Sequence, residues 1–209
     1  MTAKYCGLGC QRGDRPEHKL VCKALEEVRD NAVLSLVIAA GRGDLAKVRS
    51  LLLAGSKVDK TVSGRRTPLL AAVRRNNTAV VKLLLQSGAD ANKGDDNGSY
   101  PLMSAAEFDG GVAAAVVALL LQAGADANRG NGKGSTPLYA AVCYGNAAVV
   151  ELLLVAGAEV DTATGDGSTP LMMVAQEGHE AVAGGLLRAS ALVDKTKEKV
   201  DTEPLTPES

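Results

Sequence analysis

A Pro-Leu dipeptide that returns at nearly regular spacing is the most constraining feature of this sequence. Four copies that follow Thr or Tyr begin at Pro68, Pro101, Pro137 and Pro170, which lie 33, 36 and 33 residues apart. Self-similarity at a period of this size indicates a repeat architecture, in which each unit contacts only its neighbours. The chain is therefore predicted to fold as a linear stack of similar units.

Each copy carries the signals of two short helices. In the second copy, Thr67 can cap a helix whose first position is Pro68, where a missing N–H costs nothing. The small pair Ala72-Val73 lets neighbouring helices approach closely. Leu83 to Leu85 gives a second helix a wide apolar face, which adjacent copies must cover. Gly88 is expected to end that helix in a left-handed turn.

A polar, Gly-rich stretch such as 93–98 separates successive helix pairs and is predicted to form a hairpin-like finger. An earlier copy lacks Thr-Pro but keeps Ala39-Ala40, Leu51 to Leu53 and Gly55. Only 2% of residues are aromatic, so the core must use small aliphatic side chains at close helix spacing. The prediction is an all-α solenoid of about five helix-turn-helix units over 31–194, with hairpin-like fingers. Their boundaries are placed near 31–63, 64–96, 97–132, 133–165 and 166–194.

This pattern resembles the ankyrin repeat family, over about four-fifths of the chain. The resemblance implies a protein-binding scaffold whose partner lies on the concave face, along finger tips and first helices. Two copies depart from the pattern. Three extra residues around 110–113 are expected to bulge between the helices of the third copy and to disturb stacking. Gly184 and Gly185 lie inside the last expected helix, where each costs about 1 kcal/mol relative to Ala and favours fraying.

Residues 1–30 have a different character, with candidate metal ligands at zinc-like spacing: Cys6, Cys10, His18 and Cys22. The surrounding residues resemble the C-terminal half of a MYND-type zinc finger, although the four upstream ligands of that family are absent. Three interpretations remain open: one zinc ion held by these four residues, a metal-free remnant, or ordinary thiols in a tail.

Apolar residues at helical spacing over 16–30 predict a lead-in helix, and the charged segment 195–209 is predicted to be a disordered tail.

The ankyrin resemblance also implies which residues face a partner. The candidates are basic in the first two copies and acidic or aromatic further along: Arg42, Arg65, Arg66, Arg74, Arg75, Asp95, Asp96, Glu107, Phe108, Tyr144, Gln176 and Glu177. Arg and Tyr are common hot-spot residues. The hypothesis is that an extended, charge-patterned peptide places its acidic part on the arginines and an apolar anchor on Phe108 and Tyr144. The alternative is that Arg74 and Arg75 are solvated helix positions and that Phe108 packs against the insertion.

The overall charge excludes a bulk attraction to nucleic acid or to anionic membranes. The formal net charge is −1, with 23 basic and 24 acidic residues, so nucleic acid is an unlikely partner. The longest apolar run, 112–121, is about half of a membrane span. An intracellular protein, cytoplasmic or nuclear, is expected, as a monomer and without enzymatic activity. No nucleophile elbow or phosphate-binding loop occurs, and 130–135 lacks the spacing of such a loop.

Zinc content separates an adaptor that uses only its groove from one that is assisted by zinc. If the four N-terminal ligands form one site, the purified full chain should hold about one zinc per molecule, because a closed tetrahedral site binds tightly. Elemental analysis of protein purified without chelators measures this ratio. A value below half an equivalent would exclude the single-site interpretation.

Overall fold

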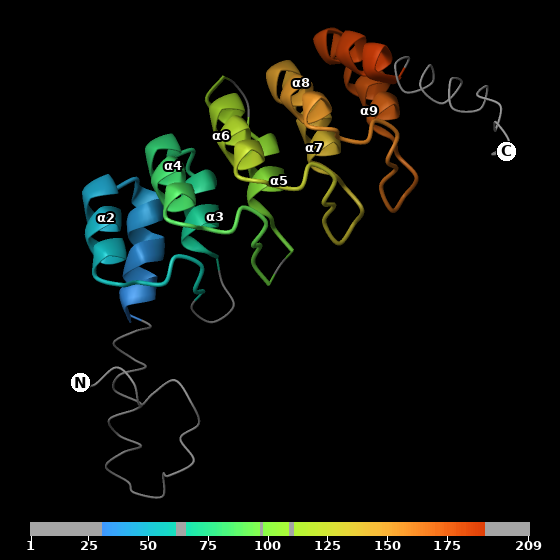
Figure 1. Ribbon diagram of the computed structural model, residues 1–209. Helices are drawn as coiled ribbons and strands as arrows, with labels where there is room; N and C mark the ends of the chain where they lie inside the picture. Colours follow the sequence, from blue (N-terminus) through green and yellow to red (C-terminus); the bar gives the residue numbers. More distant parts are fainter. Residues whose placement is uncertain (1–30, 62–65, 97, 109–110, 191–209) are drawn as a thin grey trace, which may run out of the picture.

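The computed structural model describes residues 31–190, apart from 62–65, 97 and 109–110. In this part of the chain, helix pairs are stacked side by side in one row (Figure 1). The pairs are the helix over 31–42 with α2 (Leu45–Leu53), α3 (Pro68–Val73) with α4 (Thr78–Gln86), α5 (Pro101–Ala106) with α6 (Gly111–Gln122), α7 (Pro137–Cys143) with α8 (Ala147–Val155), and α9 (Pro170–Glu177) with the helix over 180–190. The described residues contain no strand, and the predicted all-α solenoid is confirmed.

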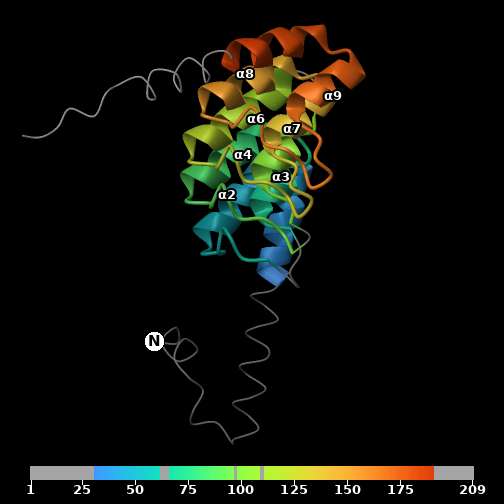
Figure 2. The same ribbon diagram turned by 90° about the vertical axis from the view of Figure 1, so that its right-hand side faces the viewer.

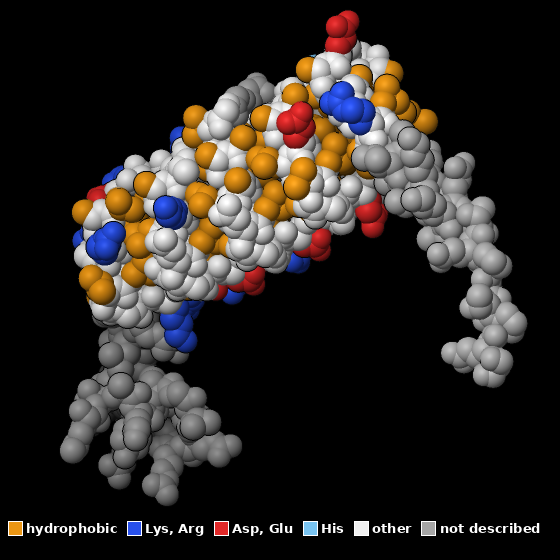
Figure 3. Space-filling model, turned by 45° about the horizontal axis from the view of Figure 1, so that its top comes forward, with side chains coloured by type: hydrophobic (Ala, Val, Ile, Leu, Met, Phe, Trp, Pro, Cys, Tyr) orange, Lys and Arg blue, Asp and Glu red, His pale blue; other side chains and the backbone are white. Residues whose placement is uncertain are grey.

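The two helices of each pair form two separate rows. Figure 2 shows α2, α4, α6 and α8 along one side of the stack and the first helices along the other, with the loops between pairs projecting beyond the first helices. Figure 3 shows the side formed by the second helices, where hydrophobic side chains are spread widely and charged side chains are few. The stack therefore has two long faces of different chemistry.

The first helices begin where the Thr-Pro signal predicts. The Thr67 hydroxyl oxygen accepts a hydrogen bond from the backbone N–H of Leu70 at 3.1 Å, and Thr136 accepts one from Tyr139 at 3.2 Å. Pro occupies the first turn in α3, α5, α7 and α9. These caps satisfy a helix N–H that would otherwise lack an intrahelical partner, so each short helix has a defined start.

The core consists of small side chains at the contacts between pairs. Ala39, Ala72, Ala105 and Ala141 are 5%, 0%, 1% and 0% exposed. They occupy equivalent positions of successive first helices, and α3, α5, α7 and α9 contact one another in that order. A methyl side chain keeps neighbouring backbones close, and so the whole row shares one continuous core.

Helices α4, α6 and α8 each end in a left-handed glycine, as predicted. The φ angles of Gly88, Gly124 and Gly157 are 84°, 82° and 84°. A residue with a Cβ is disfavoured at such an angle. The chain then reverses toward the next finger in the same way in all three copies.

Asparagine side chains join the turns at Gly124 and Gly157 to the preceding copy. The Asn92 side chain donates to the carbonyl oxygen of Gly124 at 2.8 Å and accepts from the N–H of Asp126 at 2.8 Å. Asn128 makes the same pair with Gly157 at 3.1 Å and with Glu159 at 2.8 Å. These bonds satisfy backbone groups at the turns and fix the register between successive copies.

The fingers close through one repeated set of backbone bonds. The N–H of Asp95 donates to Ser99 O at 3.0 Å, that of Asn131 to Ser135 O at 2.9 Å, and that of Thr164 to Ser168 O at 2.9 Å. A glycine with positive φ sits three residues after the first member of each pair, at positions 98, 134 and 167. The described part of each finger is therefore a tight hairpin-like turn.

The three extra residues of the third copy lengthen a helix, so the expectation of a disruptive bulge is wrong. α6 has 12 residues, whereas α4 and α8 have 9 each. Three residues make nearly one turn of about 3.6. The addition therefore leaves the buried stripe of Val116, Val117 and Leu120 in phase, and α6 contacts both α4 and α8.

The last helix continues through its two glycines. It is helical over 180–190 and buries Val182 and Leu186. Its expected fraying stays a prediction.

The lead-in helix over 16–30 and the tail 195–209 lie outside the described residues. None of the helices in the described ranges has the length and apolar content needed to cross a membrane.

Asn146 offers a test of the side-chain bonds that join the pairs. It is 8% exposed, donates to the carbonyl oxygen of Phe108 at 2.9 Å and accepts from the N–H of Val149 at 3.3 Å. Asn146→Ala removes both hydrogen bonds and leaves the carbonyl oxygen of Phe108 and the N–H of Val149 without them. The change should lower the free energy of unfolding by about 1–3 kcal/mol in urea titrations. The exposed control Gln86→Ala should change it by less than about 0.5 kcal/mol. Equal effects of the two changes would contradict the assigned role.

Candidate partner-binding groove

The basic candidates converge where the first two helix pairs meet. Arg42 lies at the end of the helix over 31–42 and Arg66 precedes α3, while Arg74 and Arg75 follow directly after it. The ends of neighbouring first helices lie side by side because the repeats stack in register. Residues more than 20 positions apart in sequence, such as Arg42 and Arg66, are thereby brought to one place.

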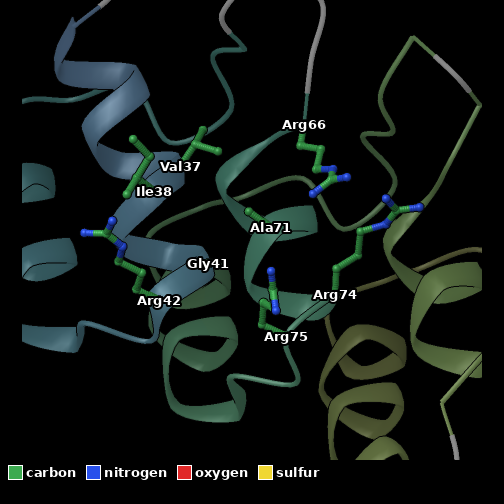
Figure 4. Close-up of a pocket in the computed structure, with 8 residues that line it drawn as sticks. All are labelled: Val37, Ile38, Gly41, Arg42, Arg66, Ala71, Arg74 and Arg75. Carbon is green, nitrogen blue, oxygen red and sulfur yellow. The ribbon is translucent and has the colours of Figure 1, made fainter.

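A pocket of about 490 Å³ lies between these arginines, and we call it the arginine pocket. Its lining combines four basic side chains with small and apolar ones: Val37, Ile38, Gly41, Arg42, Arg66, Ala71, Arg74 and Arg75. Figure 4 shows Arg66 and Arg75 on the α3 side near Ala71, with Arg42 and Arg74 to either side. The pocket is thus apolar at its wall and cationic at its rim.

The positive charge of this pocket is uncompensated within the described part of the chain. No carboxylate lines the pocket, and none of these four arginines forms an ion pair with another described residue. Grouped like charges repel one another, and a bound anion would relieve that repulsion. Guanidinium groups present forked donors that suit carboxylates and other oxyanions.

The two candidate aromatic residues differ in accessibility. Tyr144 is 49% exposed at the end of α7. Phe108 is half-buried and packs against the core, and its carbonyl oxygen accepts from Asn146. Tyr144 is therefore better placed than Phe108 to contact a partner. The burial of Phe108 favours the second hypothesis for this residue, in which its side chain packs inside the protein.

The acidic candidates also divide into two kinds. Asp95 is held in its finger, because its carboxylate accepts from the N–H of Ser99 at 3.0 Å. Asp96, Glu107, Gln176 and Glu177 are exposed. A partner can reach these four without breaking a finger turn.

A second hollow, of about 420 Å³, lies between the fourth and fifth fingers and was not predicted from the sequence. Its lining includes Lys133, Tyr139 and Asp166. Hydrogen bonds from Thr164 and Ser168 hold the pKa of Asp166 below its usual value, so it stays ionised. The apolar neighbours of Tyr139 in the sequence gave no sign that its ring would border a polar hollow.

Two groups at this end of the stack, the Cys143 thiol and the Tyr139 hydroxyl, have raised pKa values. Burial raises the pKa of the Cys143 thiol, and the nearby charge of Glu177 raises it further, while a hydrogen bond with Tyr139 acts in the opposite direction. Burial likewise raises the pKa of Tyr139. A thiol with a raised pKa is protonated at neutral pH, which is the state of an inert cysteine.

Several candidate residues fall outside the described ranges. These are Arg65 and the N-terminal Cys6, Cys10, His18 and Cys22. Within the described ranges, His, Cys, Asp and Glu side chains form no group of three or more that could hold a metal ion.

Comparison with known proteins identifies the family. A model of the family "Ankyrin repeats (3 copies)" matches residues 36–131 and 111–198, well over half of the chain. The chain therefore belongs to the ankyrin repeat family. Ankyrin repeats are protein-binding modules, and the family is typically non-enzymatic.

Two curated relatives match shorter segments. An ankyrin repeat-containing protein of Treponema pallidum (strain Nichols) is 35% identical over 83 residues, which cover 39% of this chain and 27% of the relative. A protein of Oryza sativa subsp. japonica named "Probable E3 ubiquitin-protein ligase XBOS32" is 36% identical over 75 residues, covering 35% of this chain and 15% of that protein. The matches span well under a third of either relative.

The environment of Cys143 predicts slow alkylation. At pH 7.5 iodoacetamide should modify Cys143 more slowly than a free cysteine, because its raised pKa leaves little thiolate. Glu177→Gln should speed the reaction, since removing the negative charge lowers that pKa. Peptide mapping by mass spectrometry follows Cys143 separately from the other thiols. A rate unchanged by Glu177→Gln would contradict the charge effect.

Proposed function

We propose that this chain is an interaction adaptor that holds an extended segment of a partner protein along the groove formed by its first helices and fingers. The acidic part of that segment occupies the arginine pocket, and an apolar side chain contacts Tyr144. The observation that carries this proposal is the cluster of four arginines around one pocket, with no carboxylate among the described residues that line it.

The shape of the pocket supports a side chain as its occupant. A volume of about 490 Å³ is within the range of small-ligand sites, which is about 300–1,000 Å³. The wall formed by Val37, Ile38 and Ala71 can cover the aliphatic part of a Glu or Asp side chain, while guanidinium groups bind its carboxylate. A segment with several acidic residues would meet several arginines at once.

Charges further along the groove favour one direction of the bound segment. Beyond the arginine pocket come Asp96 and Glu107 and then, past Tyr144, the exposed Gln176 and Glu177. Like charges at a contact are costly, so a partner segment that is acidic throughout would be repelled from the acidic half. The preferred partner is acidic at one end and neutral or basic at the other.

A second candidate function uses the same groove and adds the N-terminal segment. Cys6, Cys10, His18 and Cys22, with their MYND-like surroundings, favour a zinc-assisted adaptor that also binds a short proline-containing motif. The zinc measurement above separates this candidate from the simpler adaptor.

Charge reversal in the arginine pocket tests the groove. Affinity capture from a native extract supplies the partner, and a short fluorescein-labelled peptide with glutamates at one end and an aromatic anchor supplies a defined probe. The double change Arg74→Glu with Arg75→Glu should weaken binding of both by about tenfold, because attraction at two positions becomes repulsion. Fluorescence polarisation measures the change.

The matched control reverses two charges on the other face, Arg49→Glu with Lys82→Glu. Both side chains are exposed on second helices, so this variant has the same net charge but an intact arginine pocket. It should bind the probe and the partner as the unaltered chain does. Unchanged affinity in the Arg74 and Arg75 variant, or an equal loss in the control, would refute the assignment of the pocket.

A further inference from the structure

The arginine pocket holds more positive charge than one carboxylate can neutralise. Arginine side chains stay protonated in proteins, so its four arginines carry a formal charge of +4. Neither His nor a carboxylate is among the described residues that line the pocket. A sphere of about 490 Å³ is about 10 Å across, close to the Debye length of about 8–10 Å, so these charges repel one another. A ligand with two negative charges relieves this repulsion better than a ligand with one.

The four arginines reach the pocket from different backbone positions. Arg66 precedes α3 and Arg75 follows it, and Figure 4 shows their side chains on either side of Ala71. α3 has 6 residues and is about 9 Å long, so long side chains from its two ends can reach the same bound group. Arg42 comes from the preceding first helix, and Arg74 is the C-cap of α3. A group bound here can therefore accept hydrogen bonds from several directions.

Hydrogen bonds from Asn77 hold the two sides of the pocket together. Its side-chain amide donates to the backbone oxygen of Ala40 at 3.0 Å and to that of Gly41 at 3.1 Å. These bonds join the end of the first helix of copy one to the turn that follows α3. The backbone positions of Arg42 and Arg75 are thereby fixed relative to each other before a ligand binds, which lowers the cost of binding.

A phosphorylated side chain matches these features better than a carboxylate does. A carboxylate has two oxygens and one charge, and a single guanidinium can occupy both oxygens. Phosphoserine and phosphothreonine carry a charge of about −1.5 to −2 at pH 7 and have three strong acceptor oxygens, so they can bind two or more guanidinium groups together. The short aliphatic part of such a side chain can lie on Ala71 and on Ile38, which is 44% exposed.

The charges beyond the pocket favour one phosphate over a chain of them. Asp96 and Glu107 of the third copy are exposed further along the groove. A nucleic-acid strand that continued along the groove would bring more phosphates to these carboxylates, where like charges repel. A protein segment with a single phosphorylated residue avoids this cost.

We propose that the arginine pocket recognises a phosphorylated serine or threonine of the partner segment. This inference rests on the proposed function, in which a partner segment lies in the groove, and it specifies the chemistry of the acidic part of that segment. An unmodified hydroxyl side chain leaves the four arginines without a counter-ion, whereas the phosphorylated side chain supplies one. Phosphorylation of the partner therefore turns binding on.

Three fluorescein-labelled peptides test the proposal on the full chain. They are identical, with an aromatic anchor near one end, except that one position near the other end is threonine, glutamate or phosphothreonine. The phosphothreonine peptide should bind about tenfold more tightly than the glutamate peptide, because its second charge and third oxygen engage further arginines. The threonine peptide should bind most weakly. Fluorescence polarisation at one salt concentration gives the three dissociation constants.

The dependence on pH distinguishes a bound dianion from a bound carboxylate. The second pKa of a phosphate ester is about 6, so the dianion rises from about one quarter of the peptide at pH 5.5 to nearly all of it at pH 7.5. The affinity of the phosphothreonine peptide should therefore rise about fourfold over this range. The glutamate peptide should change less than about twofold, because a glutamate with a pKa of about 4.3 is ionised throughout.

Neutral variants test which arginines hold the phosphate. Arg66→Gln and Arg75→Gln should each weaken binding of the phosphothreonine peptide about tenfold but that of the glutamate peptide about threefold or less, because a carboxylate contacts fewer arginines. Arg49→Gln, on the outer side of α2, is the matched control and should change neither affinity. All three positions are exposed, so circular dichroism and the unfolding transition should be unchanged.

The outcomes separate this inference from the proposed function. Equal affinities of the glutamate and phosphothreonine peptides, or a phosphothreonine affinity that does not change with pH, would overturn phosphate recognition and leave the adaptor in place. Equally weak binding of all three peptides would overturn both. A single-stranded RNA oligonucleotide that displaces the phosphothreonine peptide and binds more tightly would assign the pocket to nucleic acid and would likewise overturn this inference.

Discussion

The structure depends on one constraint: no helix pair can bury its own apolar surface. Each second helix carries a leucine-rich face that is wider than its partner helix can cover, and the adjacent pairs complete the coverage. This requires the backbones of neighbouring first helices to approach closely, which the buried Ala39, Ala72, Ala105 and Ala141 allow. Larger side chains at these positions would separate the pairs and expose the leucines.

The same constraint explains how the stack tolerates an insertion. Packing between pairs depends on the phase of the buried stripe and not on helix length. Three residues added at the start of α6 amount to nearly a full turn, so Val116, Val117 and Leu120 remain directed toward the core. The asparagine bonds at Asn92 and Asn128 then hold the turns on either side in register. An insertion of one or two residues would have rotated the stripe away.

A stack built in this way leaves two long faces with different chemistry. The groove side carries the arginine pocket, the finger tips and Tyr144, and it suits a partner with patterned charge. The side formed by α2, α4, α6 and α8 is poor in charge and carries many apolar side chains (Figure 3).

The sequence alone determined the fold class, because its signals are local and repeated. Thr-Pro starts, small pairs, leucine runs and left-handed glycines each act within a few residues, and their recurrence indicated the stack. The sequence also identified the arginines as candidates. Only the tertiary structure decided that Arg42 and Arg66 share a pocket, that Phe108 packs against the core, and that Asp95 closes a finger. Tertiary structure likewise decided that the extra residues lengthen α6. The physical reason is that these features depend on distances between repeats, which are set by packing and hydrogen bonds among residues far apart in the chain.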